Sequence, residues 1–248
     1  MEFEFLRAAY NNIDTDSTFI VDISDPDMQN TLMDFMRSGL VTYAGRSRLQ
    51  YAAPLIRIIM GKRLYTHRLG LAPSGNNFEQ FLRLSIERMR PSELCSSLSH
   101  GLDKNSRLLE RAWQKEWTMA ASTAVPSGHT ISPDVGAVFR SSGFLNFYIN
   151  GGLNWGVELM REGERMSQHI NRFKPKGTYE NIPLTAWAII DFRHNSLIPN
   201  CQTMEDNIWY ALYANDYSII TIMRKDKTDE TIRLRGDDPE LFPNDRQN

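Results

Sequence analysis

The spacing of apolar residues changes near residue 131, and this change is the strongest constraint on the fold. Apolar residues in 106–124 recur at helical spacing, which gives the clearest helix signal in the chain. From Ile131 onward, short runs rich in β-branched and aromatic residues replace this pattern, as is typical of strands. A long helix followed by successive strands predicts an α/β fold.

Residues 131–193 are expected to form one compact α/β unit, a strand meander followed by a helix and a strand. Turn-forming residues 140–143 and 150–152 separate the first three strands. The run at 184–192 is almost wholly apolar, as in a central strand. Glu158 is expected at the polar edge of this unit. The predicted elements are strands at 134–139, 144–149 and 155–160, a helix at 161–173 and a strand at 184–192.

Two domains are predicted, a mainly helical region at 1–90 and an α/β domain at 91–240. In the first, Asp25 and Pro26 are expected to start a helix that Gly39 ends. A strand at 49–54 and helices at 55–60 and 77–90 follow. This order fits a winged-helix-like region or a small helical cap, and both interpretations stay open. Further strands are expected at 208–213, 219–223 and 231–234.

Composition excludes several classes of function. The net charge is −2, so any nucleic-acid site has to be a local basic patch. Cys95 and Cys201 lack zinc-ligand spacing and are expected to be reduced thiols. The N-terminal segment is acidic, and no apolar run is long enough to cross a bilayer. We therefore expect a soluble protein with no signal peptide in this chain and no membrane partner.

Acidic residues supply the candidate chemistry. Glu158 lies between Val157 and Leu159 on an apolar strand, so its side chain faces the opposite way from theirs. A buried carboxylate is costly unless a cation or water satisfies it. A metal-dependent nuclease needs two or three carboxylates around a divalent cation. Asp134 could join Glu158, with Glu110 or Glu116 from the long helix, although such carboxylates are more often salt-bridged or solvated.

Cationic residues near Glu158 are candidate phosphate ligands. His169 and Arg172 are three residues apart and hence on one helix face. They could bind phosphate or form part of a solvated helix surface. Asp191 and Arg193, at the end of the last strand of the unit, could pair with each other or line the site.

Several stretches follow one another in residues 90–235: Arg90-Pro91 with Leu94, LLERAWQKEW (108–117), SPDVGAVFRSSGFLNFYI (132–149), NWGVELMREG (154–163), HINRF (169–173) and WAIIDFR (187–193). Together they resemble the C-terminal region of Crinkler-type effectors of oomycetes and fungi. The resemblance implies a restriction-endonuclease-like fold with a PD-(D/E)xK site, secretion, and action in the host nucleus. GRSRLQYAAPLIR (45–57), just upstream, is also similar to the family.

The resemblance assigns roles to particular residues. Glu158 corresponds to the acid of the third strand, and Pro133-Asp134 reads literally as PD. On this basis Glu158 and Asp134 are the expected Mg²⁺ ligands. Together with the residues that the pattern itself indicates, the expected catalytic group is Glu158, Asp134, Glu116 and Arg161, and His169 and Arg172 are expected to bind phosphate.

Two residues depart from the motif of the family. Asn146 stands where the family more often has Asp, and Met160 stands where the motif has Lys. Asn146 cannot give a metal an anionic ligand, and Met160 cannot orient water. The chain also contains no GxxxxGK[ST] loop, so it is not the NTPase-like part that often precedes this fold.

Three hypotheses follow. The first is an effector nuclease that cleaves DNA with Mg²⁺ or Mn²⁺ and loses this activity on Glu158→Gln. The second is a catalytically inactive pseudo-nuclease that binds nucleic acid or a host protein, which Asn146 and Met160 favour. The third is an unrelated interaction domain in which Glu158 only pairs with Arg161 or Arg193.

Overall fold

The computed structural model divides the chain into two compact units, Met1–Arg68 and Leu69–Asn248. It describes residues 5–6, 8–9, 18–45, 48–52, 74–97, 107–200, 202 and 204–238. The predicted boundary at residue 90 lies inside the second unit, because the helix at Phe78–Glu87 packs with the later elements. No helix in these ranges is long and apolar enough to cross a membrane.

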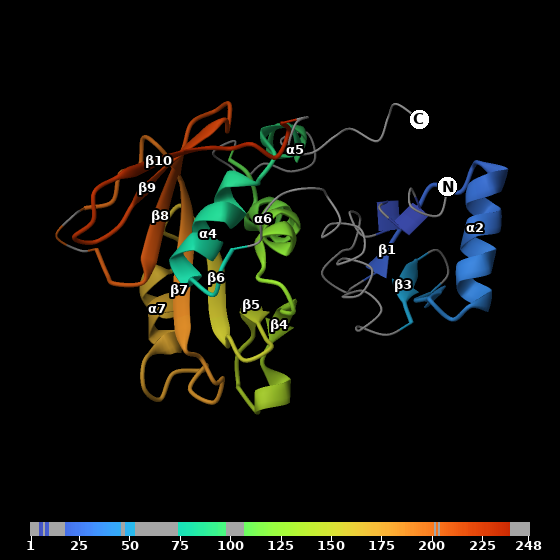
Figure 1. The fold of residues 1–248 in the computed structure, drawn as a ribbon, viewed down its shortest axis with the longest axis horizontal. Coiled ribbons are helices and arrows are strands. Elements are labelled where there is room, and N and C mark those ends of the chain that lie inside the picture. The colour runs from blue at the N-terminus through green and yellow to red at the C-terminus, as the bar shows by residue number, and fades with distance from the viewer. Residues whose placement is uncertain are drawn as a thin grey trace. The chain divides into compact units, whose positions relative to one another are not determined.

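The first unit contains a small antiparallel sheet and one long helix (Figure 1). Helix α2 (Pro26–Arg37) begins as predicted, because the Asp25 side chain accepts a hydrogen bond from the N–H of Asp27 and Pro26 takes the first helical position. Gly39 follows the helix with a φ of 70°. The strands are β1 (Thr18–Phe19), β2 (Val41–Tyr43) and β3 (Leu49–Tyr51), in the order β1-β3-β2.

A helix-turn-helix requires two consecutive helices. Residues 20–40, which connect β1 to β2, contain only α2. The winged-helix interpretation therefore lacks its helix-turn-helix in this segment. The predicted helix at 55–60 lies outside the described residues.

The second unit is a mixed seven-stranded sheet with the order β10-β9-β8-β7-β6-β5-β4. Strands β6, β7 and β8 are parallel, and the strands on both sides pair antiparallel. The strands are β4 (Ile131–Val135), β5 (Leu145–Ile149), β6 (Trp155–Arg161), β7 (Ala186–His194), β8 (Ile208–Tyr213), β9 (Ile219–Met223) and β10 (Glu230–Arg233).

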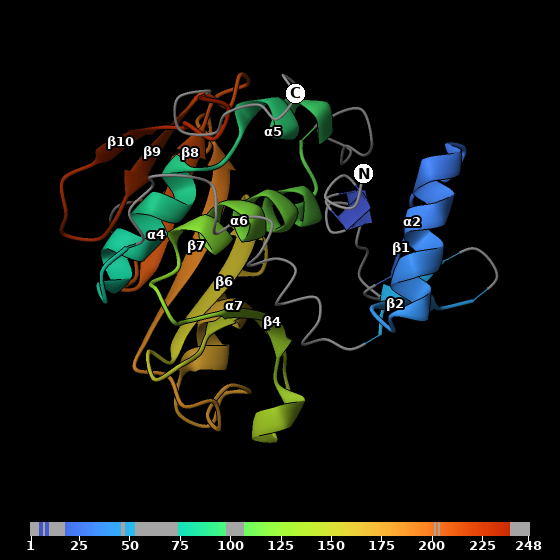
Figure 2. The same cartoon turned by 45° about the vertical axis from the view of Figure 1, so that its right-hand side comes forward.

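Helices cover both faces of this sheet (Figures 1 and 2). Helices α4 (Phe78–Glu87) and α6 (Glu110–Ala124) lie on one face, and α5 (Pro91–Ser97) connects them along the chain. Helix α7 (Met166–Phe173), which follows β6, packs on the other face. The alternation of strand side chains separates the two cores, so Val157 and Leu159 face α6 whereas Met160 faces α7.

Two predicted elements differ from the structure. The strand predicted at 134–139 ends at Val135 and is followed by a 3₁₀ turn, Ala137–Phe139. The helix predicted from Arg161 begins at Met166, because β6 extends to Arg161 and a turn follows. In that turn Glu162, Gly163 and Arg165 have positive φ values, which a right-handed helix cannot accommodate.

Trp113 is the central packing residue of α6. It is fully buried and stacks on Phe192 of β7, with ring centroids 4.3 Å apart and planes 4° apart. We expect Trp113→Ala to lower the free energy of unfolding by about 3–5 kcal/mol, through lost burial and the cavity left behind. Urea unfolding measures this change.

Lys115 provides the matched control, because it is an exposed residue on the same helix. Lys115→Ala should change the free energy of unfolding by less than about 0.5 kcal/mol. Equal effects of the two substitutions would contradict the packing of α6 on the sheet.

Candidate functional site

Glu158 lies at the centre of the large sheet and not at its edge. Strand β6 pairs with β5 on one side and β7 on the other, and the Glu158 side chain is fully buried. The expectation of a polar edge position is therefore wrong. Because Val157 and Leu159 point to the α6 face, Glu158 points to the α7 face.

Two side chains of α7, an imidazole and a guanidinium, contact this carboxylate. His169 Nδ1 lies 2.5 Å from Glu158 Oε1, and Arg172 donates to the same oxygen through Nη1. Burial is the largest influence on the pKa of Arg172 and lowers it, but the charge of Glu158 and the contacts with Tyr179 and Glu158 together raise that pKa above its ordinary value. The predicted phosphate ligands therefore come together with Glu158, but their polar groups are directed at the carboxylate.

Tyr179 completes the surroundings of Glu158. Its hydroxyl donates to the carbonyl of Phe144 at 2.7 Å and accepts from Arg172 at 3.3 Å. Burial and the nearby Glu158 charge raise its pKa, so the phenol stays neutral. The second carboxylate oxygen of Glu158, Oε2, is buried and makes no hydrogen bond with the described residues.

A second acid, Glu110, lies in the electrostatic environment of this cluster. It occupies the first turn of α6, and burial is the main cause that raises its pKa. The charge of His169 lowers the same pKa, and that of Glu158 raises it. Of the two acids of α6, Glu110 is therefore the one whose pKa responds to the charge of Glu158.

Glu116 has a structural role on the other face of the sheet. It is 3% exposed and accepts hydrogen bonds from Nε, Nη2 and the backbone N–H of Arg90, at 2.8–3.1 Å. Six helical residues separate it from Glu110, so the two side chains point about 120° apart. The predicted catalytic role of Glu116 is incompatible with this position.

Asn146 contributes an amide where a nuclease motif has an acid. Its Oδ1 accepts the backbone N–H of Leu159 at 2.8 Å. The β5–β6 ladder ends at the pair Phe147–Val157, so the Asn146 side chain replaces the next main-chain acceptor. Met160, at the lysine position of the motif, is fully buried in the apolar cluster under α7.

Asp134 lies on the outermost strand, β4, and is exposed to solvent. Its backbone has a φ of 50°, between the ladder pairs Pro133–Phe147 and Val135–Leu145. The described ranges contain no group of three His, Cys, Asp or Glu side chains that could hold a metal ion. The residues present therefore do not fit the Mg²⁺ site that the resemblance implies.

Arg161 faces away from Glu158. Its guanidinium donates to the carbonyl of Leu108 at 2.9 Å and pairs with Glu164 at 3.1 Å. It fixes the segment before α6 to the end of β6 and does not replace the missing lysine.

Asp191 and Arg193 pair with each other, one of the two arrangements expected. Arg193 Nε donates to Asp191, which also accepts the N–H of Gly163 at 3.0 Å. Burial raises the pKa of Asp191, although Arg193 lowers it in part. The third hypothesis paired Glu158 with Arg161 or Arg193, but Arg172 and His169 take that place.

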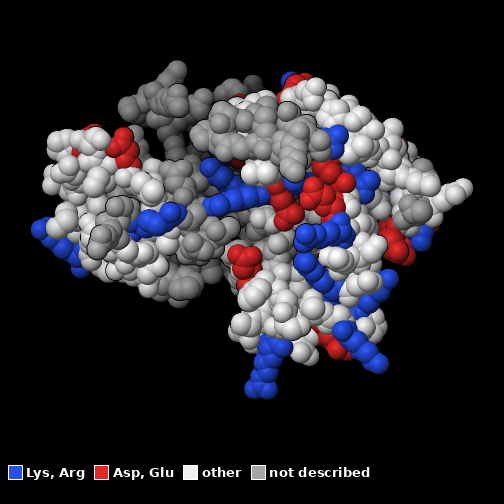
Figure 3. Space-filling model, turned by 180° about the vertical axis from the view of Figure 1, so that it is seen from behind, with Lys and Arg blue, Asp and Glu red and all other residues white. Residues whose placement is uncertain are grey.

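Opposite charges lie side by side on the α7 face. Figure 3, seen from behind, shows basic and acidic side chains next to one another. Arg107 pairs with Glu162 at 2.9 Å, which fits this mixed pattern.

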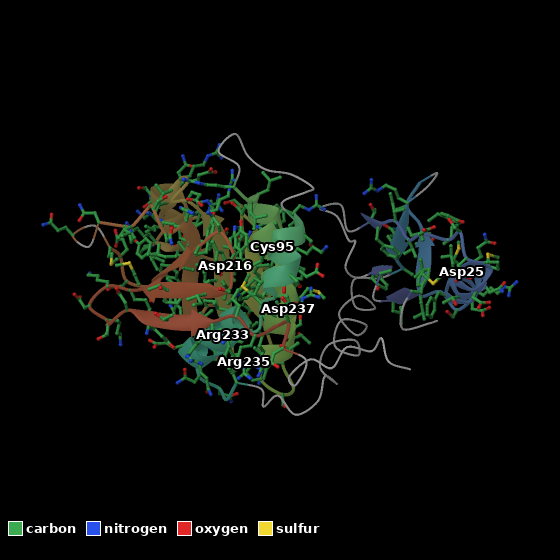
Figure 4. The ribbon with its side chains drawn as sticks, turned by 90° about the horizontal axis from the view of Figure 1, so that it is seen from above. Asp25, Cys95, Asp216, Arg233, Arg235 and Asp237 are labelled. Atoms are coloured by element: carbon green, nitrogen blue, oxygen red, sulfur yellow. The ribbon has the colours of Figure 1, made fainter. Side chains whose placement is uncertain are left out.

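A hollow of about 670 Å³ lies elsewhere, between the end of β10 and α5 (Figure 4). Asp237 accepts hydrogen bonds from the backbone and hydroxyl of Ser92, and Arg235 pairs with Asp238 at 2.9 Å. None of the predicted site residues lines it. The lining residues are Pro91, Ser218, Arg233, Leu234, Arg235, Asp237 and Asp238.

Sequence reasoning missed Tyr179 and assigned Glu116 in place of Glu110. Tyr179 follows the Pro175–Gly177 turn, where no periodicity marks an inward-facing residue. The 100° advance per residue shows that Glu110 and Glu116 cannot share a site, but the sequence does not tell which helix face meets the sheet.

Comparison with known proteins gives no assignment. No model of a known protein family, no curated protein and no solved structure matches the chain.

The Glu158–Arg172 pair should contribute strongly to stability. We expect Arg172→Met to lower the free energy of unfolding by about 2–3 kcal/mol, because a buried carboxylate loses a main counter-charge. Water reaches the Arg172 side chain, which is 35% exposed, so the expected loss of stability is smaller than for a pair in which both side chains are fully buried. Adding Glu158→Gln should recover much of it, and chemical denaturation of the double-mutant cycle measures the coupling.

Lys174→Met is the matched control, because Lys174 is exposed immediately after α7. If Arg172→Met costs no more than Lys174→Met, the pair makes no net contribution and the prediction is wrong.

Glu110 should make stability depend on pH. Its folded-state pKa lies above its unfolded value, so the folded carboxyl keeps its proton to higher pH. Its favourable contribution is then present below the unfolded pKa and is lost as the pH rises through the folded pKa. Relative to Glu110→Gln, the wild-type protein should lose stability from about pH 4.5 upward, as denaturation at a series of pH values would measure.

Other buried acids with raised pKa values, Glu116 and Asp191, titrate in both proteins and cancel in this difference. A difference that stays constant with pH would contradict the assignment to Glu110.

Proposed function

We propose that the second unit is a restriction-endonuclease-like domain that no longer hydrolyses phosphodiester bonds with a metal and instead binds nucleic acid. The order of its elements supports the fold. Helix α6, the meander β4–β5–β6, the crossover helix α7 and the parallel strand β7 follow one another along the chain. This is the meander, helix and strand that the resemblance to Crinkler-type effectors leads us to expect.

The state of Glu158 is the observation that supports loss of hydrolysis. A nuclease carboxylate has to be available to a divalent cation and share it with further acidic ligands. Glu158 is fully buried, its charge is already paired with that of Arg172, and His169 also contacts it. The reaction also needs an acidic metal ligand and a lysine, and Asn146 and Met160 stand at those two positions.

A retained metal-dependent nuclease is the second candidate, and Glu110 is the observation in its favour. Two acids, Glu110 and Glu158, influence each other electrostatically at this site. A metal would have to displace Arg172 from Glu158 and draw on the Asn146 amide. Each change costs the buried interactions described above, so this candidate ranks below the first.

Nucleic acid is the partner we favour because unpaired cations surround α7. Arg140, Arg165, Lys174 and Lys176 are exposed, and no ion pair to them occurs within the described part of the chain. The resemblance further supports a secreted effector that acts in the host nucleus, where nucleic acid is abundant.

The purified chain should leave DNA uncut. We expect no cleavage of plasmid or labelled oligonucleotides with Mg²⁺ or Mn²⁺, together with binding whose affinity falls as salt rises, because bound phosphates release counterions. Gel analysis and fluorescence anisotropy measure the two properties.

Metal-dependent cleavage that disappears in Glu158→Gln would overturn the proposal in favour of the active nuclease. Absence of any nucleic-acid binding in a folded sample would favour a protein partner.

A further inference from the structure

Two loops on the α7 side are held together as one surface. Residues 136–144 connect β4 to β5, and residues 174–182 follow α7. Ser141 Oγ donates to the carbonyl of Thr178, and Asn181 Nδ2 donates to the carbonyl of Arg140 at 3.3 Å. Tyr179 binds the carbonyl of Phe144. These hydrogen bonds fix the side chains of the two loops relative to each other.

This paired-loop surface carries a local excess of positive charge. Arg140, Lys174 and Lys176 are exposed, and Glu180 is the only acidic residue in the two loops. Within the described ranges these three cations form no ion pair. They differ in this respect from Arg161, Arg172 and Arg193, each of which forms an ion pair within the unit.

An exposed aromatic ring lies in the same surface. Phe144 is 61% exposed, and every other aromatic side chain in the described part of the second unit is buried or half-buried. Its ring lies against Gly136, where an added Cβ would come within 3.2 Å of Phe144. Next to Lys174, Phe173 stacks on the half-buried Trp187 with ring centroids 4.1 Å apart.

We infer that the paired-loop surface binds single-stranded nucleic acid, with Phe144 stacking on a base while Arg140, Lys174 and Lys176 contact phosphates. An exposed ring flanked by cations suits an unpaired strand, because only there is a base face free to stack. This inference rests on the proposed function and names the form of nucleic acid and the surface that binds it. An acidic peptide would use the cations but would gain no base stacking from Phe144.

The test compares a fluorescently labelled oligo(dT) strand with a duplex of equal length by anisotropy, using the full chain. We expect tighter binding of the single strand. Phe144→Ala should weaken oligo(dT) binding roughly five- to tenfold through lost stacking, with little effect on the duplex. The triple variant Arg140→Gln, Lys174→Gln, Lys176→Gln should flatten the slope of log K against log salt by about 2, since three phosphate contacts are lost.

Lys225→Gln with Lys227→Gln is the matched control, because these exposed lysines lie in the turn between β9 and β10. This control should leave oligo(dT) affinity nearly unchanged. All substituted side chains are exposed, so circular dichroism and thermal unfolding should match the wild type. That comparison separates loss of binding from loss of structure.

The outcomes distinguish the inference from the function on which it rests. Binding to neither strand form would refute the proposed function itself. If binding is salt-sensitive but neither Phe144→Ala nor the triple variant changes it, the paired-loop surface is not the binding site, and only the further inference is refuted. Competition by oligoglutamate as strong as by unlabelled oligo(dT) would overturn the inference in favour of an acidic peptide.

Discussion

A carboxylate buried within a seven-stranded sheet sets the chemistry of this molecule. Strand β6 has neighbours on both sides and helices on both faces, so no position on it between Trp155 and Met160 reaches solvent freely. A lone carboxylate in that setting is unstable as an anion. Helix α7 supplies the compensation from one face, with His169 and Arg172 three residues apart and both directed at Glu158.

The same solution recurs at the other buried acids of the unit. Glu116 is held by Arg90, Asp191 by Arg193, and Glu162 by Arg107 together with the Tyr213 hydroxyl at 2.6 Å. Each of these acids thus pairs with its own arginine. Pairing each buried acid with its own cation stabilises the interior of the unit. It contrasts with a hydrolytic metal centre, where carboxylates converge and a cation from solution neutralises them.

The parts of the fold that were predictable follow from local rules. Strands β8 and β9 have the predicted bounds, because a short continuous apolar run between turn residues indicates both the strand and its ends. The N-terminus of α2 was readable from Asp25 and Pro26. The start of α7 was not, since the left-handed backbone at Glu162 and Arg165 carries no glycine signal at those positions. For the candidate site, the sequence indicated Glu158, His169 and Arg172, but it did not indicate that His169 and Arg172 contact the Glu158 carboxylate.

Sequence alone determined most of the succession of helices and strands, and that Glu158 faces the opposite way from Val157 and Leu159. It also placed Asn146 and Met160 at two positions of the expected motif. Those features depend on backbone periodicity and residue type, which are local. Only the tertiary structure decided that Arg172 and His169 contact Glu158, that Glu116 is held by Arg90, and that Asp134 is exposed. Each of these depends on which helix face meets which sheet face, and packing between distant segments sets that choice.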